Sequence, residues 1–193
     1  MRSLRRLLLV IWWRLSGRPA PPPHLVKQRI IIAYARRFGL TTLVESGTYL
    51  GDMVADVRPR FARIYSIELA RDLADRARAR FAGDNAVVIL CGDSAQVLPP
   101  LLKQIHKPCL FWLDGHYSGG ITALGNGITP IARELEAILD DSVTNHVILI
   151  DDARLFNGED GYPRLEDIRE LVRQRGPAAS FEVEDDVIRV CPV

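Results

Sequence analysis

The chain of 193 residues is long enough for one domain with a sizeable core and leaves little room for a second. Hydrophobic residues make up 48% and charged residues 25%, the balance of an ordinary soluble globular protein, and the net charge of +1 gives no reason to expect a nucleic-acid partner. Cys91, Cys109 and Cys191 are far apart and odd in number. They therefore favour a reducing, cytoplasmic location over a disulfide framework or a zinc site.

The first 23 residues differ from the rest of the chain. Residues 1–16 combine arginines with an apolar run, and a proline-rich linker follows, so the predicted domain begins at residue 24 and extends to 193. The apolar run is shorter than the ~20 residues that span a bilayer, and Arg14 follows it where a signal peptide would need small residues. Two interpretations stay open: an interfacial helix that touches a membrane peripherally through Trp12 and Trp13, or a helix packed against the domain or a homodimer partner.

From residue 25 the chain alternates helices and strands. A helix is predicted over 25–38, and Gly39 follows it at the C′ position, which glycine favours. Strands are predicted at 42–46, 63–69, 86–91, 109–114 and 146–150, with helices between them and near 165–174. Two further strands, 180–184 and 187–191, flank Asp185 and Asp186 and are predicted to form a hairpin. This order predicts an α/β fold, a Rossmann-like, doubly wound, mostly parallel seven-stranded sheet with a C-terminal antiparallel hairpin strand.

Acidic residues stand where the predicted strands end. They are Glu45, Glu68, Asp93, Asp114 and the pair Asp151-Asp152. Ligands of open α/β sheets bind outside the carboxyl ends of the strands, so these carboxylates should line one crevice. Since buried carboxylates need donors or cations, the row indicates a ligand rich in hydroxyl and amino groups, with a metal at its far end.

The segment from Glu45 to Gly51 joins the first strand to its helix. Gly47 permits a tight turn close to a ligand, and Gly51 lets the helix begin against the strand. The glycines do not have the G-x-G-x-x-G spacing of a dinucleotide site, and there is no Walker A lysine. The segment instead resembles motif I of the class I S-adenosylmethionine-dependent methyltransferases, and the resemblance extends to about residue 150.

The resemblance implies a role for each residue of the cofactor half. Glu68 would accept hydrogen bonds from the two ribose hydroxyls, Asp93 and Ser94 would contact the adenine amino group, and Glu45 and Gly47 would lie under the methionine part. In the alternative, Glu68 and Asp93 merely cap the helices that follow them.

The other half of the predicted crevice, where the chemistry would take place, is formed by Asp114, Asp151 and Asp152, which end neighbouring strands. Clustered carboxylates need compensation, which a hard divalent cation supplies. The arrangement looks like the magnesium site of catechol-type and macrolide-sugar O-methyltransferases, which implies these three residues as Mg²⁺ ligands. In the alternative, only Asp114 faces the cofactor, and the pair caps the last crossover helix.

The chain departs from that group after Asp114. Tyr117 stands where catechol-type enzymes carry a catalytic lysine, so His116 is expected as the general base, with Asp114 as the rival. The glycine-rich residues 117–129 are expected to form either a substrate-covering loop or a simple connection.

These patterns predict S-adenosylmethionine-dependent methyl transfer to a hydroxyl of a small molecule or saccharide, assisted by Mg²⁺. The alternatives are a metal-independent N- or C-methyltransferase and a non-catalytic scaffold protein with the same fold. An α/β oxidoreductase is disfavoured by the glycine spacing.

Overall fold

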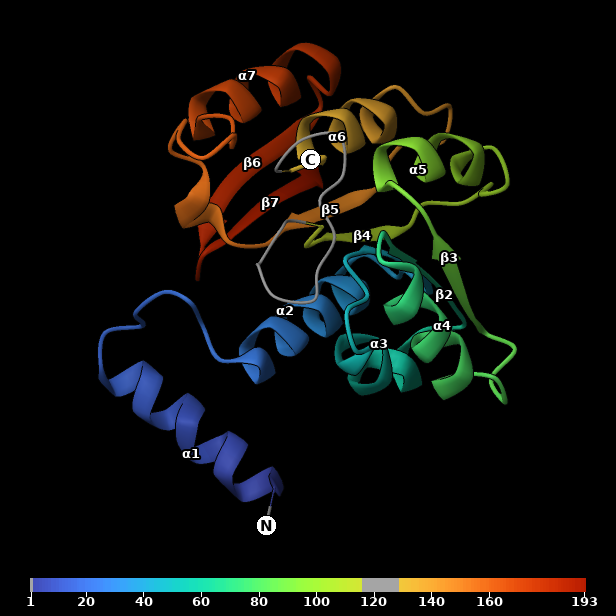
Figure 1. Ribbon diagram of the computed structural model, residues 1–193. Helices are drawn as coiled ribbons and strands as arrows, with labels where there is room; N and C mark the ends of the chain where they lie inside the picture. The colour runs from blue at the N-terminus through green and yellow to red at the C-terminus, as the bar shows by residue number, and fades with distance from the viewer. Residues whose placement is uncertain (1, 116–128) are drawn as a thin grey trace.

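A computed structural model describes residues 2–115 and 129–193. Its centre is one seven-stranded sheet in the order β3-β2-β1-β4-β5-β7-β6 (Figure 1). The strands are β1 (Thr42–Ser46), β2 (Arg63–Glu68), β3 (Val87–Cys91), β4 (Leu110–Leu113), β5 (Val147–Ile150), β6 (Ala179–Glu184) and β7 (Val187–Pro192). The first five are parallel, and β7 is antiparallel to both β5 and β6. The predicted doubly wound sheet with its C-terminal hairpin is confirmed.

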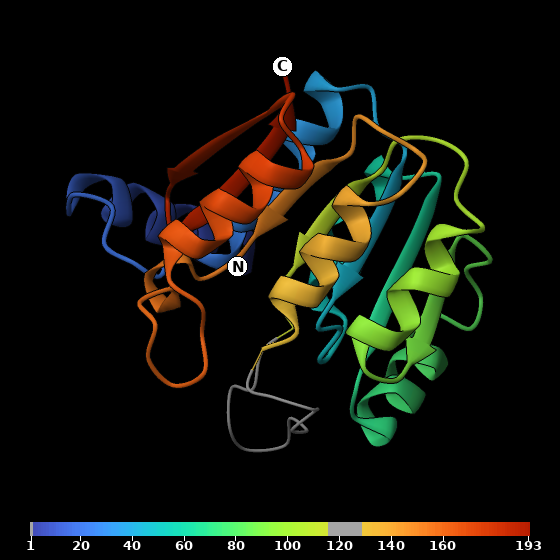
Figure 2. The same cartoon turned by 90° about the horizontal axis from the view of Figure 1, so that it is seen from above.

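Helices cover both faces of this sheet. On one face lie α2 (His24–Arg37), α3 (Asp52–Val57) and α4 (Arg71–Arg80), and on the other lie α5 (Ser94–Leu102), α6 (Ile131–Leu139) and α7 (Leu165–Arg175). Figure 2 shows α5, α6 and α7 side by side over one face. Short 3₁₀ turns, η1 (Arg58–Arg60) and η2 (Ala153–Leu155), complete the described elements. α1 (Arg2–Leu15) is N-terminal to these elements and contacts α2.

The central strands form because their sequences are apolar at every position. All four residues of β4 and all four of β5 are buried, as expected for strands covered on both faces. Alternate residues point to the two cores: Phe111 joins the core under α5, α6 and α7, whereas Trp112 joins the core under α2 and α3. This double burial holds the carboxyl ends of the strands in fixed register, which positions the site.

Two turns follow directly from residue type. Gly39 follows the α2 C-cap residue Phe38 and has φ +66°, the left-handed backbone that glycine adopts at no cost. Asp185 and Asp186 have φ of +53° and +63°, so they form the two-residue turn with positive φ at both positions that suits a tight hairpin. Among the described residues, no helix is both long enough and apolar enough to cross a membrane.

Candidate functional site

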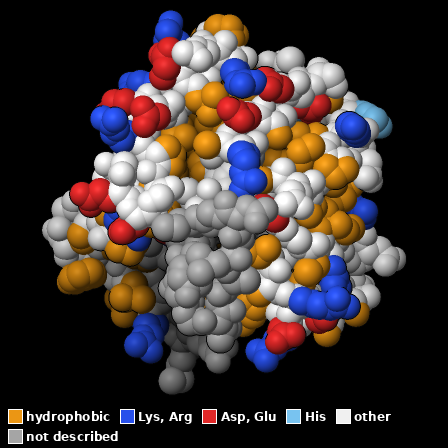
Figure 3. All heavy atoms as spheres, turned by 45° about the horizontal axis from the view of Figure 1, so that its top comes forward, with side chains coloured by type: hydrophobic (Ala, Val, Ile, Leu, Met, Phe, Trp, Pro, Cys, Tyr) orange, Lys and Arg blue, Asp and Glu red, His pale blue; other side chains and the backbone are white. Residues whose placement is uncertain are grey.

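The residues predicted to line one crevice lie at the carboxyl ends of β1 to β5. Glu45 is the penultimate residue of β1, Glu68 ends β2, and Asp93 follows β3. Asp114 follows β4, and Asp151 and Asp152 follow β5. Because β1 and β4 are neighbours at the centre of the sheet, the order of strands changes direction there, which is the position where open α/β sheets bind ligands. Where Figure 3 shows the described surface, charges of both signs are interspersed with apolar side chains.

Gly47 is held in a turn that no other residue could form. Its φ is +89°, and its N–H donates to the carbonyl oxygen of Ile67 at 2.9 Å. A Cβ atom on Gly47 would lie 2.5 Å from the backbone oxygen of Asp114. Gly51 has φ +75°, and a Cβ there would lie 2.8 Å from the Phe81 ring. The sequence pattern thus has a steric cause at both glycines.

Glu68 links the glycine turn to the helix after β2. One carboxylate oxygen accepts from the backbone N–H of Tyr49 at 2.7 Å, and the other accepts from Ala70 N–H at 2.9 Å. Tyr49 itself has φ +50°, so this bond holds an unfavourable backbone conformation in the turn. Glu68 thus accepts from the N–H of Ala70, the N-cap residue of α4. This contact is similar to the helix capping that the alternative interpretation expected. Each carboxylate oxygen retains a lone pair for a ligand hydroxyl.

Asp93 caps α5 as the alternative interpretation expected. Its Oδ1 accepts from Ala95 N–H at 3.0 Å. Its Oδ2 is buried, has no hydrogen-bond partner among the described residues, and lies 3.8 Å from Arg133 Nη2. Capping therefore uses one oxygen of Asp93 and leaves the other available to a donor. Ser94 is buried beside it as the first residue of α5.

Glu134 on α6 was not foreseen from the sequence. The side chain is fully buried next to Ser46 and Ser94. Within the described part of the chain, neither carboxyl oxygen has a partner with hydrogen-bond geometry. Burial raises the pKa of Glu134 to about 7, although the two serine hydroxyls oppose the shift. A signal was present in the sequence, because Glu134 stands on the same helical face as Ile131 and Ile138.

Glu45 is buried at the base of the crevice. It is 1% exposed and accepts a short hydrogen bond from Ser66 Oγ, which lies 2.6 Å from Thr48 Oγ1. Burial, together with the charges of Asp114 and Glu68, raises the pKa of Glu45 to about 8 against the opposing Ser66 hydrogen bond. Glu45 therefore holds a proton at neutral pH in the unliganded protein.

The three carboxylates at the ends of β4 and β5 converge. One oxygen from each of Asp114, Asp151 and Asp152 lies within 4.8 Å of those of the other two. Burial, together with the charge of Asp114, raises the pKa of Asp151 to about 7, although Lys27 opposes the shift. The predicted cluster is therefore present in the geometry, and its hard oxygen donors are of the kind that Mg²⁺ prefers.

Lys27 is the second residue that sequence reasoning missed. It reaches the cluster from α2, and its Nζ donates to Asp151 Oδ2 in an ion pair and lies 3.4 Å from Asp152 Oδ1. Burial opposes the charge on Lys27, but Asp151, Asp152 and Asp114 outweigh this effect and raise its pKa. The only sequence signal was that Lys27 is one of three lysines in an arginine-rich chain.

A second cation contacts the cluster from the other side. Arg154 Nη1 donates to Asp152 Oδ1 at 2.7 Å and also pairs with Asp186 in the hairpin turn. Beside this cluster, Phe156 and Tyr162 pack edge to face with ring centroids 5.6 Å apart. Burial, together with the charges of Asp152 and Asp114, raises the pKa of Tyr162 to about 12. Both aromatic side chains are buried, so the carboxylates adjoin the hydrophobic core on this side.

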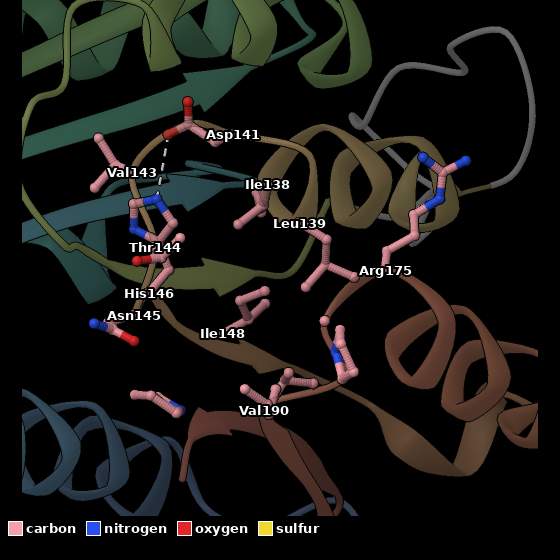
Figure 4. A pocket seen from close by; sticks show the side chains of 15 residues that line it. Ile138, Leu139, Asp141, Val143, Thr144, Asn145, His146, Ile148, Arg175 and Val190 are labelled. Atoms are coloured by element: carbon pink, nitrogen blue, oxygen red, sulfur yellow. Dashed lines mark hydrogen bonds and ion pairs between the residues drawn. The ribbon is translucent and has the colours of Figure 1, made fainter.

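His116, the expected general base, and Tyr117 lie outside the described residues, as does most of the glycine-rich stretch after them. The other histidine near the sheet, His146, is structural. Its Nδ1 accepts from Cys109 N–H at 3.1 Å, and its Nε2 lies 3.3 Å from Asp141 Oδ2. It lines a separate pocket of about 220 Å³ at the amino end of β5, which contains no predicted site residue (Figure 4).

Comparison with solved structures identifies the fold. The O-methyltransferase TomG from Streptomyces achromogenes, bound to S-adenosylmethionine, is 17% identical with a TM-score of 0.65, over 97% of this chain and 88% of that one. An O-methyltransferase from Bacillus cereus in complex with S-adenosylhomocysteine is 16% identical with a TM-score of 0.64, over 96% of this chain and 90% of that one. This is the class I S-adenosylmethionine-dependent O-methyltransferase fold.

A fungal structure with the same methyltransferase fold agrees. The S-adenosylhomocysteine-bound methyltransferase PaMTH1 of Podospora anserina is 17% identical with a TM-score of 0.61, over 97% of this chain and 87% of that one. No protein-family model and no curated protein matches the sequence. The resemblance inferred from the motifs is thus confirmed as a likeness of fold to O-methyltransferases.

Proposed function

We propose that this protein transfers the methyl group of S-adenosylmethionine to a hydroxyl oxygen of a small molecule or saccharide. The observation that carries the proposal is the Gly47 turn, packed against Asp114 and bonded through Tyr49 to Glu68, within the methyltransferase fold. Its two buried thiols, Cys109 and Cys191, are free, which suits a cytoplasmic enzyme.

The cofactor half of the crevice is suited to the polar groups of S-adenosylmethionine. Glu68 can accept from two vicinal ribose hydroxyls, and Asp93 Oδ2 is available for the adenine amino group. Glu45 would lie under the methionine part, where ionisation of its carboxyl group would favour the cationic cofactor. Ser94 begins the helix next to the adenine position.

The transfer needs two reactants in line and a deprotonated acceptor. A lone pair of the acceptor oxygen forms the new bond to the methyl carbon while the bond from that carbon to sulfur breaks. The electron pair stays on sulfur, which becomes the neutral thioether of S-adenosylhomocysteine. The acceptor proton passes to His116 or to Asp114, the two general bases that the sequence offers.

Asp114, Asp151 and Asp152 would hold a divalent cation, since their oxygens are close together and of the right type. A bound Mg²⁺ lowers the pKa of a coordinated hydroxyl. Lys27 would have to leave its ion pair with Asp151 to admit the cation, because its ammonium group already compensates the same carboxylates.

The Lys27 ion pair also favours a second candidate, methyl transfer without a metal. In that case Lys27 and Arg154 remain as the permanent counter-charges of Asp151 and Asp152, and Asp114 faces the acceptor. Turnover in the presence of EDTA distinguishes the two candidates, since only the first loses activity on chelation and regains it with Mg²⁺.

Calorimetric titration with S-adenosylhomocysteine tests the shared part of both candidates. We expect one-site binding at micromolar concentration and roughly tenfold or weaker affinity in Glu68→Gln, which keeps the shape but removes the charge. Glu182→Gln is the matched control, because Glu182 is exposed on β6. Absence of binding by the unaltered protein at high micromolar ligand would overturn the methyltransferase proposal in favour of the scaffold alternative.

A further inference from the structure

The N-terminal helix α1 packs on the domain by one side only. Val10 and Trp13 are buried in the core that also contains α2, and Trp13 Nε1 donates to the carbonyl oxygen of Pro19 at 2.8 Å. Arg6 pairs with Asp56 of α3 at 3.2 Å. These contacts fix the orientation of α1 beside α2 at the edge of the molecule (Figure 1).

The opposite side of α1 is apolar and exposed. Seven of the eleven large apolar side chains that are exposed in the described residues belong to this one helix: Leu4, Leu7, Leu8, Leu9, Ile11, Trp12 and Leu15. Leu4, Trp12 and Leu15 have exposed fractions of 64%, 63% and 84%. Positions 4, 8, 11 and 15 follow helical spacing, so they form a continuous stripe rather than scattered residues. A contiguous apolar surface of this kind marks a binding face.

The charge around this stripe has one sign. Arg5 and Arg14 are exposed on its two borders, and α1 contains no acidic residue. The first 44 residues of the chain hold nine of its 25 Lys and Arg residues and none of its 24 Asp and Glu residues. The net charge of +1 therefore conceals a strongly basic N-terminal segment joined to an acidic remainder.

We propose that α1 binds the surface of a lipid bilayer that contains anionic lipids. The apolar stripe lies in the boundary between headgroups and acyl chains, Trp12 sits at the interface, and Arg5 and Arg14 contact lipid phosphates. With 14 residues the helix is about 21 Å long, so it lies along the membrane and does not cross it. A second copy fits this stripe less well, because pairing two α1 helices would bring arginines together without a carboxylate from either helix.

Flotation of the full chain with vesicles tests this proposal. We expect the protein to float with vesicles of phosphatidylcholine and phosphatidylglycerol, and about tenfold less with phosphatidylcholine alone. The variant Leu8→Ser/Trp12→Ser should reduce partitioning at least about tenfold, and Arg5→Gln/Arg14→Gln should reduce it on anionic vesicles only. Val183→Ser, at an exposed apolar residue of β6, is the matched control and should float like the unaltered protein.

Circular dichroism and sedimentation velocity accompany each variant. Unchanged helix content in the variants makes loss of flotation specific to the exposed face of α1. Equal flotation with neutral and anionic vesicles would overturn the role of the arginines. No flotation, combined with a dimer that Leu8→Ser/Trp12→Ser dissociates, would show that the face joins two copies and would overturn the lipid proposal. No flotation of a monomer would overturn it as well.

Discussion

Lys27 of α2 and Asp151 at the end of β5 form a buried ion pair across 124 residues of sequence. The Asp151 side chain is completely buried, and that of Lys27 is 15% exposed. The pair therefore ties the helix that precedes the sheet to the central crevice. It also makes Lys27 the natural competitor of any cation at Asp114, Asp151 and Asp152.

Replacing Lys27 with Met should destabilise the protein and sensitise it to Mg²⁺. Without Lys27 the pKa of Asp151 should rise further, so this carboxyl group takes up a proton at neutral pH, and the lost ion pair should cost about 1–3 kcal/mol in the free energy of unfolding. Urea denaturation at pH 7.5 measures this loss, with Lys103→Met as an exposed control. If the carboxylates bind a metal, Mg²⁺ should raise the melting temperature more in Lys27→Met than in the unaltered protein. An equal response in both would argue against metal binding at this cluster.

Replacing Gly47 with Ala should disrupt the crevice. The new Cβ would lie 2.5 Å from the Asp114 backbone oxygen at a φ of +89°, so we expect a loss of about 3 kcal/mol in the free energy of unfolding. S-adenosylhomocysteine affinity should fall with it in calorimetry. Gly83→Ala is the control, since a Cβ there meets nothing within 4 Å. Equal stability of the two variants would contradict the steric account.

Glu45 should make the free energy of unfolding fall as the pH rises. Its pKa is about 8 in the folded protein and near the ordinary value of 4.5 when unfolded, so the unfolded chain loses this proton first as pH rises. The folded state is therefore progressively disfavoured between pH 4.5 and 8, and the cost is constant above that range. Glu45→Gln should remove this cost and raise the free energy of unfolding by up to about 5 kcal/mol at pH 8.5, with little gain at pH 4.5. Denaturant titration at both pH values checks this, with Glu182→Gln as the control.

Truncation of Trp13 should release α1, whereas truncation of Trp12 should not. Trp13 is 3% exposed, whereas its neighbour Trp12 is 63% exposed. Trp13→Ala should release α1 from the domain at a cost of about 3 kcal/mol and speed tryptic cleavage after Arg14, which is followed by Leu15. Trp12→Ala should leave the cleavage rate unchanged. Similar digestion of both variants would show that α1 is not anchored through Trp13.

The sequence predicted the fold well because buried parallel strands leave a strong signature. The four residues of β5 are apolar and buried, and the position of Asp151 just after them follows from where the strand ends. The same reasoning placed Asp114 and Asp152 in one cluster, as the geometry shows.

Lys27 could not be placed by local pattern, and Glu134 was missed although its pattern carried a signal. The partner of Lys27 is distant in the chain, so its ion pair depends on how α2 docks against the sheet. Glu134 did carry a local signal, since an acidic residue on an apolar helical face must be buried with some compensation. The roles of Glu68 and Asp93 toward a cofactor remain predictions, because the same carboxylates also bond the first N–H groups of helices.

The contact between Gly47 and the Asp114 backbone has a consequence for the kinetics of ligand capture. Since the turn after β1 and the end of β4 already touch, this wall of the crevice is assembled before any ligand arrives. Little conformational entropy is then lost there on binding, and no slow rearrangement of this wall should precede it. Association along this side should accordingly follow a single phase whose rate increases linearly with ligand concentration.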